Sequence, residues 1–179
     1  KLTFINGEEG ILRYAGYPIQ ELAENATFPE VSYLVLYGEL PTQAQLDKFR
    51  AGLAECAALH TSLLNHYNGF PADAPPMAIL SAMLNAVACY NPEVLEVHSD
   101  GPEFDQTATL LLSKVRSVSA CAYRMANGLP FNEPNPNLSY CGNFLHMLFS
   151  KPYQPYEIHP AVEKAMNLFF ILHADHEQN

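Results

Sequence analysis

The chain has 179 residues, 49% of them apolar and 16% charged, with a formal net charge of −10. This length and apolar content are enough for a buried core, which excludes a disordered, solvated protein. Only nine residues are Lys or Arg, so nucleic-acid binding is not expected. The sequence contains no run of eighteen apolar residues, so no membrane span is predicted.

The first sixteen residues predict a β-hairpin. Strand-like runs at 2–5 and 11–14 flank the pair Asn6-Gly7, which is a strong turn signal, and Gly10 indicates a bulge. Residues 17–179 have the pattern of helices joined by short connections rich in Pro and Gly. The fold class is therefore mainly α, a multi-helical chain with a small N-terminal hairpin.

Proline and glycine mark the limits of the first helices. One helix is expected from Pro29 to residue 36, with Gly38 as its stop. The next begins in a capping box at Thr42 and carries a continuous apolar stripe of about six turns to Tyr67. His60 lies on this stripe and is expected to be a core or interface histidine.

Four further helices are expected along the rest of the chain. The first opens at Pro76 and places four apolar residues on one face: Met77, Leu80, Leu84 and Val87. The second runs from Phe104 to a stop at Gly128, with a stripe of Ala108, Leu111, Val115, Val118, Ala122 and Met125. A short helix turns Leu138, Cys141, Leu145 and Leu148 inward, and the last runs from Pro160 to the chain's end. The four cysteines are widely spaced, so we expect buried free thiols.

The last helix carries the polar residues that indicate a site. Its apolar face (Met166, Phe169) continues into His173 and His176, which are one turn apart. These histidines could donate hydrogen bonds to an oxygen-rich ligand, or they could be satisfied core histidines, and the pattern supports both equally. Metal binding is less well supported, because Ala174 follows His173 where the zinc motif HExxH needs Glu, and no further ligands are indicated. No metal is therefore expected.

Residues 172–179 (LHADHEQN) resemble the LHADHExN signature of citrate synthases. Three further segments resemble the same family in the same order: 10–19 (GILRYAGYPI), 30–42 (EVSYLVLYGELPT) and 138–145 (LSYCGNFL). Ala15 stands where the family usually has Arg. The resemblance covers essentially the whole chain and is nearest to the citrate synthases of Gram-negative bacteria.

The resemblance implies a citrate (Si)-synthase, which condenses acetyl-CoA with oxaloacetate and water to citrate and CoA in the tricarboxylic acid cycle. His176 matches the histidine that holds oxaloacetate, with Asn179 and His173 beside it. Residues 1–179 are then part of the large helical domain of a longer protein. The catalytic residues and the small domain are expected C-terminal to Asn179, so the chain alone should be inactive. The resemblance implies no cofactor, since acetyl-CoA is a substrate.

The resemblance also bears on regulation and assembly. Tyr90 and Lys114 match residues of the NADH-binding site of Gram-negative relatives, whereas Glu55, Cys56 and Leu110 depart from it. We expect a homodimer or higher homo-oligomer, because the apolar stripes exceed what so short a chain can bury alone. The expected location is the cytoplasm.

Three other functions remain open from the sequence. A 2-methylcitrate synthase would use propionyl-CoA in place of acetyl-CoA. A non-catalytic helical dimerisation or interaction module would use the long apolar stripes alone. A metal-binding helical protein is the least supported of the three.

Overall fold

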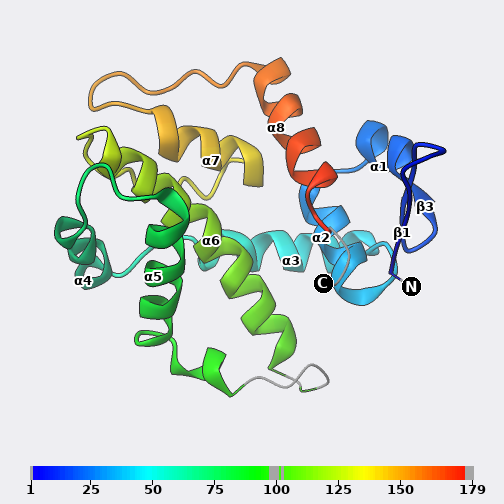
Figure 1. Ribbon diagram of the computed structural model, residues 1–179, viewed down its shortest axis with the longest axis horizontal. Coiled ribbons are helices and arrows are strands. Elements are labelled where there is room, and N and C mark those ends of the chain that lie inside the picture. Colours follow the sequence, from blue (N-terminus) through cyan, green and yellow to red (C-terminus); the bar gives the residue numbers. More distant parts are fainter. Residues whose placement is uncertain (1, 97–100, 102, 176–179) are drawn as a thin grey trace. The chain divides into compact units, whose positions relative to one another are not determined.

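Helices dominate the fold, as the sequence predicts (Figure 1). The computed structural model describes residues 2–96, 101 and 103–175. The chain divides into two units, the first made of residues 1–50 and 158–179 and the second of residues 51–157. The segment with the family signature therefore returns to the unit that contains the N-terminal strands.

The N-terminal hairpin is confirmed, with two differences. β1 (Thr3–Asn6) pairs antiparallel with β2 (Ile11–Tyr14), and a short β3 (Tyr17–Pro18) adds a third strand beyond the expected end at residue 16. Asn6 belongs to β1 and pairs with Ile11, so the turn consists of residues 7–10 and begins one residue later than expected. The Asn6 side chain closes this loop by accepting a 3.2 Å hydrogen bond from the Glu9 amide.

Four helices contribute to the first unit: α1 (Ile19–Asn25), α2 (Phe28–Tyr37), the start of α3 (Gln43–Glu55) and α8 (Pro160–Leu172). Thr27 and Glu30 form a capping box before α2, and Gly38 ends that helix in the left-handed region at φ 80°. The Asn167 amide of α8 bridges the α1–α2 connection, accepting from Phe28 N at 2.7 Å and donating to Ala26 O at 3.1 Å. The core of this unit consists of Tyr14, Ile19, Leu22, Val31, Leu34 and Ile171.

In the second unit α6 (Phe104–Ala126) packs against both α5 (Pro76–Ala88) and α7 (Tyr140–Phe149). Shorter segments complete it: α4 (Thr61–Leu64) and the 3₁₀ helices η1 (Asn65–Gly69) and η2 (Pro92–Leu95). The main core cluster gathers Leu63, Tyr67, Ile79, Met83, Val87, Leu110, Val118, Cys121 and Ala122.

The expected six-turn helix from Thr42 to Tyr67 is wrong. α3 ends at Glu55, residues 56–60 are not helical, and α4 starts after them. His60 is exposed and caps α4, with its Nδ1 accepting from Ser62 N at 3.1 Å, so it is not a core histidine.

The break has a physical cause in α6. Backbone carbonyls around residues 53–58 accept hydrogen bonds from buried side chains of α6 and not from the next turn of a helix. The donors and acceptors are Ser113 Oγ to Leu53 O (2.6 Å), Ser117 Oγ to Ala57 O (2.6 Å) and Lys114 Nζ to Ala58 O. These bonds satisfy carbonyls that would otherwise be buried without a partner.

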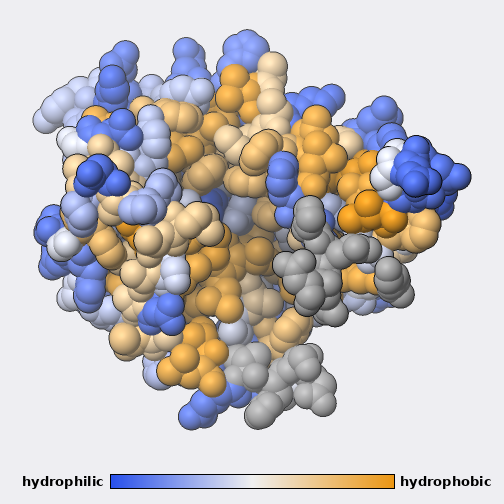
Figure 2. All heavy atoms as spheres, viewed as in Figure 1, coloured by the Kyte–Doolittle hydropathy of each residue, from blue (hydrophilic) through white to orange (hydrophobic). Residues whose placement is uncertain are grey.

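The apolar faces differ from the expected stripes in two helices. α5 buries Ile79, Met83 and Val87, whereas Met77 is 72% exposed. On α6, Leu111 and Val115 are each 37% exposed, and much of the buried surface is polar. Apolar side chains accordingly reach the surface over α5 and α6 (Figure 2). The inward face of α7 is confirmed for Cys141, Leu145 and Leu148.

The cysteines are all free thiols, as expected, but their burial varies. Cys121 and Cys141 are buried, Cys56 is half-buried and Cys89 is exposed. Cys89 is exposed because it follows the last turn of α5, where the buried face of that helix has already ended at Val87.

Candidate functional site

The candidate site begins where α8 ends. His173 is the C-cap of α8 at φ −111°, so the helix stops earlier than the expected continuation to residue 179. His176 and Asn179, the two other predicted site residues, lie outside the described residues. The expected extension of the helix through the signature segment is therefore wrong at His173, which lies just beyond the last helical residue.

His173 is exposed, which rules out a core histidine at this position. Its Nδ1 lies 2.7 Å from Phe169 O, and its ring lies against the Phe169 ring with centroids 4.4 Å apart. A carbonyl oxygen only accepts, so Nδ1 carries the hydrogen. Nε2 therefore remains available to a ligand as an acceptor in the neutral ring or a donor in the charged ring.

The N-terminal sheet binds the residues around His173. The Thr3 hydroxyl donates to Asp175 Oδ2, and the Tyr14 hydroxyl contacts Leu172 O at 3.4 Å and Asp175 O at 3.3 Å. Tyr14 is fully buried, and burial raises its pKa, so the phenol stays a donor at neutral pH. The signature segment is thus tied to the first fifteen residues of the chain.

Buried cations lie in the second unit, where they serve backbone carbonyls. Arg116 stacks on the Tyr140 ring at 4.3 Å, and Arg124 donates to Leu148 O at 2.8 Å. With Lys114, these side chains place positive charge at the C-terminal ends of α3 and α7, where helix dipoles favour it. Burial lowers the pKa of Arg116 and Lys114. None of the three is exposed enough to clamp a dicarboxylate.

The structure brings Tyr90 and Lys114 to the same segment, residues 56–60. Tyr90 is 37% exposed and stacks on the His60 ring with centroids 4.8 Å apart. Lys114 is 9% exposed and bonds to Ala58 O. Tyr90 can therefore reach a ligand in this unit, whereas the Lys114 ammonium is already bound by the protein.

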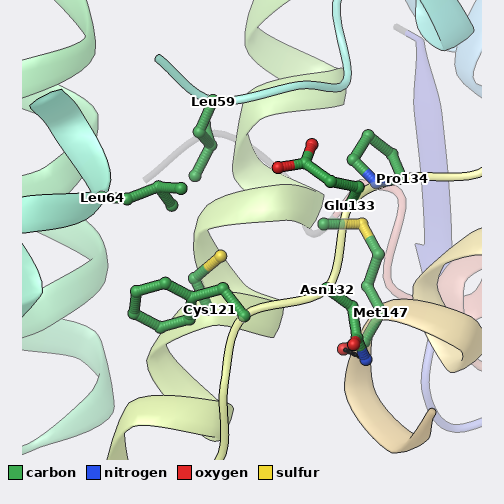
Figure 3. Close-up of a pocket in the computed structure, with 8 residues that line it drawn as sticks. Leu59, Leu64, Cys121, Asn132, Glu133, Pro134 and Met147 are labelled. Atoms are coloured by element: carbon green, nitrogen blue, oxygen red, sulfur yellow. Dashed lines mark hydrogen bonds between the residues drawn. The ribbon is translucent and has the colours of Figure 1, made fainter. Parts of the chain in front are cut away.

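A small cavity in the second unit does not suit the expected substrates (Figure 3). Cys121 enters it from α6 and Met147 from α7, and its volume is about 10 Å³. Its lining residues are Leu59, Leu64, Cys121, Phe131, Asn132, Glu133, Pro134 and Met147. These include no cation, and the Glu133 carboxyl would repel a dicarboxylate.

Neither metal binding nor membrane spanning has support in the described residues. No group of three or more His, Cys, Asp or Glu side chains among them is arranged to hold a metal ion. No helix in that part of the chain has both the length and the apolar character needed to cross a bilayer.

Sequence comparison places the chain in a family. The sequence model described as "Citrate synthase, C-terminal domain" matches residues 1–179. The chain belongs to the citrate synthase family. It is 43% identical over 178 residues to citrate synthase 1 of Mycobacterium tuberculosis and 44% identical over 179 residues to citrate synthase of Corynebacterium glutamicum. The two matches include 99% and 100% of this chain, respectively, but only 41% of the length of each relative.

Solved citrate synthases share the fold. The enzyme from Pyrobaculum aerophilum matches with a TM-score of 0.87 and 34% identity over 98% of this chain and 44% of that one. The enzyme from Thermoplasma acidophilum, solved as a ternary complex with carboxymethyl coenzyme A and oxaloacetate, matches with a TM-score of 0.88 and 27% identity. That match covers 99% of this chain and 45% of the other.

Sequence reasoning missed the contribution of the sheet to the site. Asp175 was apparent only as a polar neighbour of the histidines, and nothing in the hairpin pattern singled out Thr3 or Tyr14. Thr3 and Asp175 are separated by 172 positions in the sequence, and the two contacts of Tyr14 span 158 and 161 positions. No local pattern can therefore reveal them.

Proposed function

We propose that the protein containing this chain condenses acetyl-CoA with oxaloacetate to form citrate and CoA, and that residues 172–179 help to hold the oxaloacetate. The observation that carries this proposal is the LHADHEQN segment inside a family match that spans residues 1–179. The chain corresponds to 41% of the length of its curated relatives, so the activity is proposed for the whole gene product.

The proposed reaction assigns this chain to substrate binding. Condensation needs a carboxylate base for the acetyl methyl group, donors that polarise the oxaloacetate carbonyl, and cations for its carboxylates. His176 is proposed as a donor to oxaloacetate, with Asn179 and His173 beside it. Asp175 is a poor candidate for the base, because its carboxylate accepts from the Thr3 hydroxyl. The base and the carboxylate-binding arginines are therefore proposed to lie C-terminal to Asn179.

A thiol-release assay of the whole gene product tests this proposal. We expect oxaloacetate-dependent release of CoA with a higher kcat/KM for acetyl-CoA than for propionyl-CoA. Faster turnover of propionyl-CoA would identify a 2-methylcitrate synthase. Absence of oxaloacetate-dependent release with either thioester would refute the proposed function and favour a non-catalytic interaction module.

Homo-oligomerisation is proposed as well, as a dimer or a larger assembly. Its support is the outward face of α6, where Leu111 and Val115 are 37% exposed at i, i+4 spacing. Sedimentation at micromolar concentration should give at least a dimer, and Leu111→Glu should shift it toward the monomer. A wild-type monomer would contradict this proposal.

The finer assignments also remain proposals: a Gram-negative type of enzyme, a cytoplasmic location and inhibition by NADH. Tyr90 supports an NADH site by its exposure, whereas the bound state of Lys114 weighs against it. Titration with NADH in the thiol-release assay tests the point, and Tyr90→Ala should reduce any inhibition.

A further inference from the structure

We propose that Asp175 is a positioning residue for oxaloacetate binding, and that Thr3 and Tyr14 of the N-terminal sheet hold it in place. This inference rests on the proposed function, because it gives the sheet a part in oxaloacetate binding. It assigns Thr3 and Tyr14 a role in substrate handling as well as in folding.

The two donors come from one cross-strand pair. Thr3 lies directly opposite Tyr14 in the β1–β2 register. Side chains directly opposite each other in an antiparallel pair project from the same face of the sheet. Both are buried, with Thr3 5% exposed and Tyr14 fully buried. One face of the hairpin therefore presents two fixed hydroxyl groups to the end of α8.

These hydroxyls bind both the side chain and the backbone of the segment after α8. Thr3 donates to the Asp175 carboxylate, while the Tyr14 hydroxyl lies within 3.4 Å of Leu172 O and 3.3 Å of Asp175 O. The carbonyls at a helix C-terminus have no partner within the helix, so an outside donor determines their direction. The sheet supplies that donor here.

Packing and local hydrogen bonds hold the same segment from the helix side. Ile171 is fully buried in the core of the first unit, and Ala174 packs against that core. The His173 and Ala174 amides each donate at 3.2 Å to the carbonyl three residues earlier. The backbone is thus restrained at every residue from Ile171 to Asp175. A precise binding site needs residues held by packing and by supporting hydrogen bonds, and Thr3 and Tyr14 supply such bonds to Asp175.

Removing one hydroxyl tests the proposal in the whole gene product. Thr3→Val keeps the shape of the side chain but removes the donor, and Thr3→Ser restores it. Thr27→Val is the matched control, because Thr27 also donates to a carboxylate in the same unit, at 2.5 Å to Glu30, but away from residue 175. Tyr14→Phe removes the second donor and keeps the buried ring.

We expect Thr3→Val and Tyr14→Phe to raise the KM for oxaloacetate by about tenfold or more, since small misplacements of binding groups can cost up to about a hundredfold. The KM for acetyl-CoA should stay within about twofold of wild type. Thr3→Ser should restore the oxaloacetate KM, and Thr27→Val should leave it unchanged. If Thr3→Val lowers only the Tm and leaves the oxaloacetate KM at the wild-type value, the role is merely structural and the proposal is wrong.

Hydrogen exchange separates this inference from the proposed function. If the wild-type protein shows no oxaloacetate-dependent thiol release, the proposed function is refuted and kinetics cannot decide. Amide exchange at residues 173–175 then decides. Faster exchange by about tenfold in Thr3→Val, but not in Thr27→Val, would support restraint by the sheet. Equal exchange in the two variants would overturn it.

Discussion

Alkaline pH should destabilise the protein through the buried thiol of Cys121. This side chain is 3% exposed, and burial, reinforced by the Glu133 carboxylate, raises its pKa from 9.0 to about 12. A raised pKa in the folded state means that the folded protein keeps a proton that the unfolded chain loses. The contribution of Cys121 is therefore complete below about pH 9 and is lost as the pH rises toward 12.

The size of the effect follows from the shift. A pKa shift of about three units corresponds to about 4 kcal/mol of unfolding free energy, at about 1.4 kcal/mol for each unit, once the thiol is ionised in both states. Between about pH 7.5 and pH 10, only the unfolded thiol ionises appreciably, so the expected loss from Cys121 is about 1.4 kcal/mol.

Urea unfolding followed by circular dichroism at these two pH values measures the loss. Cys121→Ala should be less stable than wild type at pH 7.5 but should lose about 1.4 kcal/mol less on going to pH 10. Cys89→Ala is the control, because it removes a thiol that is exposed. If wild type and Cys121→Ala lose the same free energy over this range, the buried thiol does not retain its proton and the reasoning is wrong.

Four further predictions concern the site, the break before α4 and the buried Tyr67. His176→Ala in the whole gene product should lower kcat/KM for oxaloacetate by about a hundredfold with the Tm unchanged, and a variant that lost only stability would identify a core histidine. The 179-residue chain expressed alone should release no thiol above background, and oxaloacetate-dependent turnover would contradict the assignment of the base to a segment beyond Asn179. Ser117→Ala should cost about 1–3 kcal/mol in urea unfolding, because Ala57 O loses its 2.6 Å donor, whereas Ser119→Ala, at a half-buried position of the same helix, should cost much less. Tyr67→Phe should lower the unfolding free energy by about 1 kcal/mol through loss of the 2.9 Å bond to Val118 O, and an unchanged midpoint would show that this bond adds nothing.

Local signals in the sequence predicted much of the fold. Pro29 and Gly38 placed α2 to within a residue at each end, because a proline in the first turn and a left-handed glycine act locally. Gly128, also left-handed at φ 63°, follows the end of α6 in the same way, and α6 begins at Phe104 as expected. The resemblance then identified the family, which periodicity alone could not do.

Predictions that depended on distant contacts failed. The stripe through His60 predicted one helix, but donors from α6, about sixty positions away, replace the helical hydrogen bonds there. The face of α6 was wrong because periodicity counts only apolar residues, whereas Ser113, Arg116 and Arg124 are buried by their bonds to carbonyls. The end of α8 was misjudged because Tyr14 and Thr3 bind the residues beyond it.

The break before α4 has a consequence for the order of folding. The sequence around residues 42–67 favours an uninterrupted helix, and the native break is stabilised by partners sixty positions away in the chain. Contacts of such separation form late, because a long loop must close before they are made. Until α6 docks, water or the next helical turn satisfies the Leu53 and Ala57 carbonyls. The early folding ensemble should therefore be more helical in this segment than the native protein, and part of a helix must unwind in the final step.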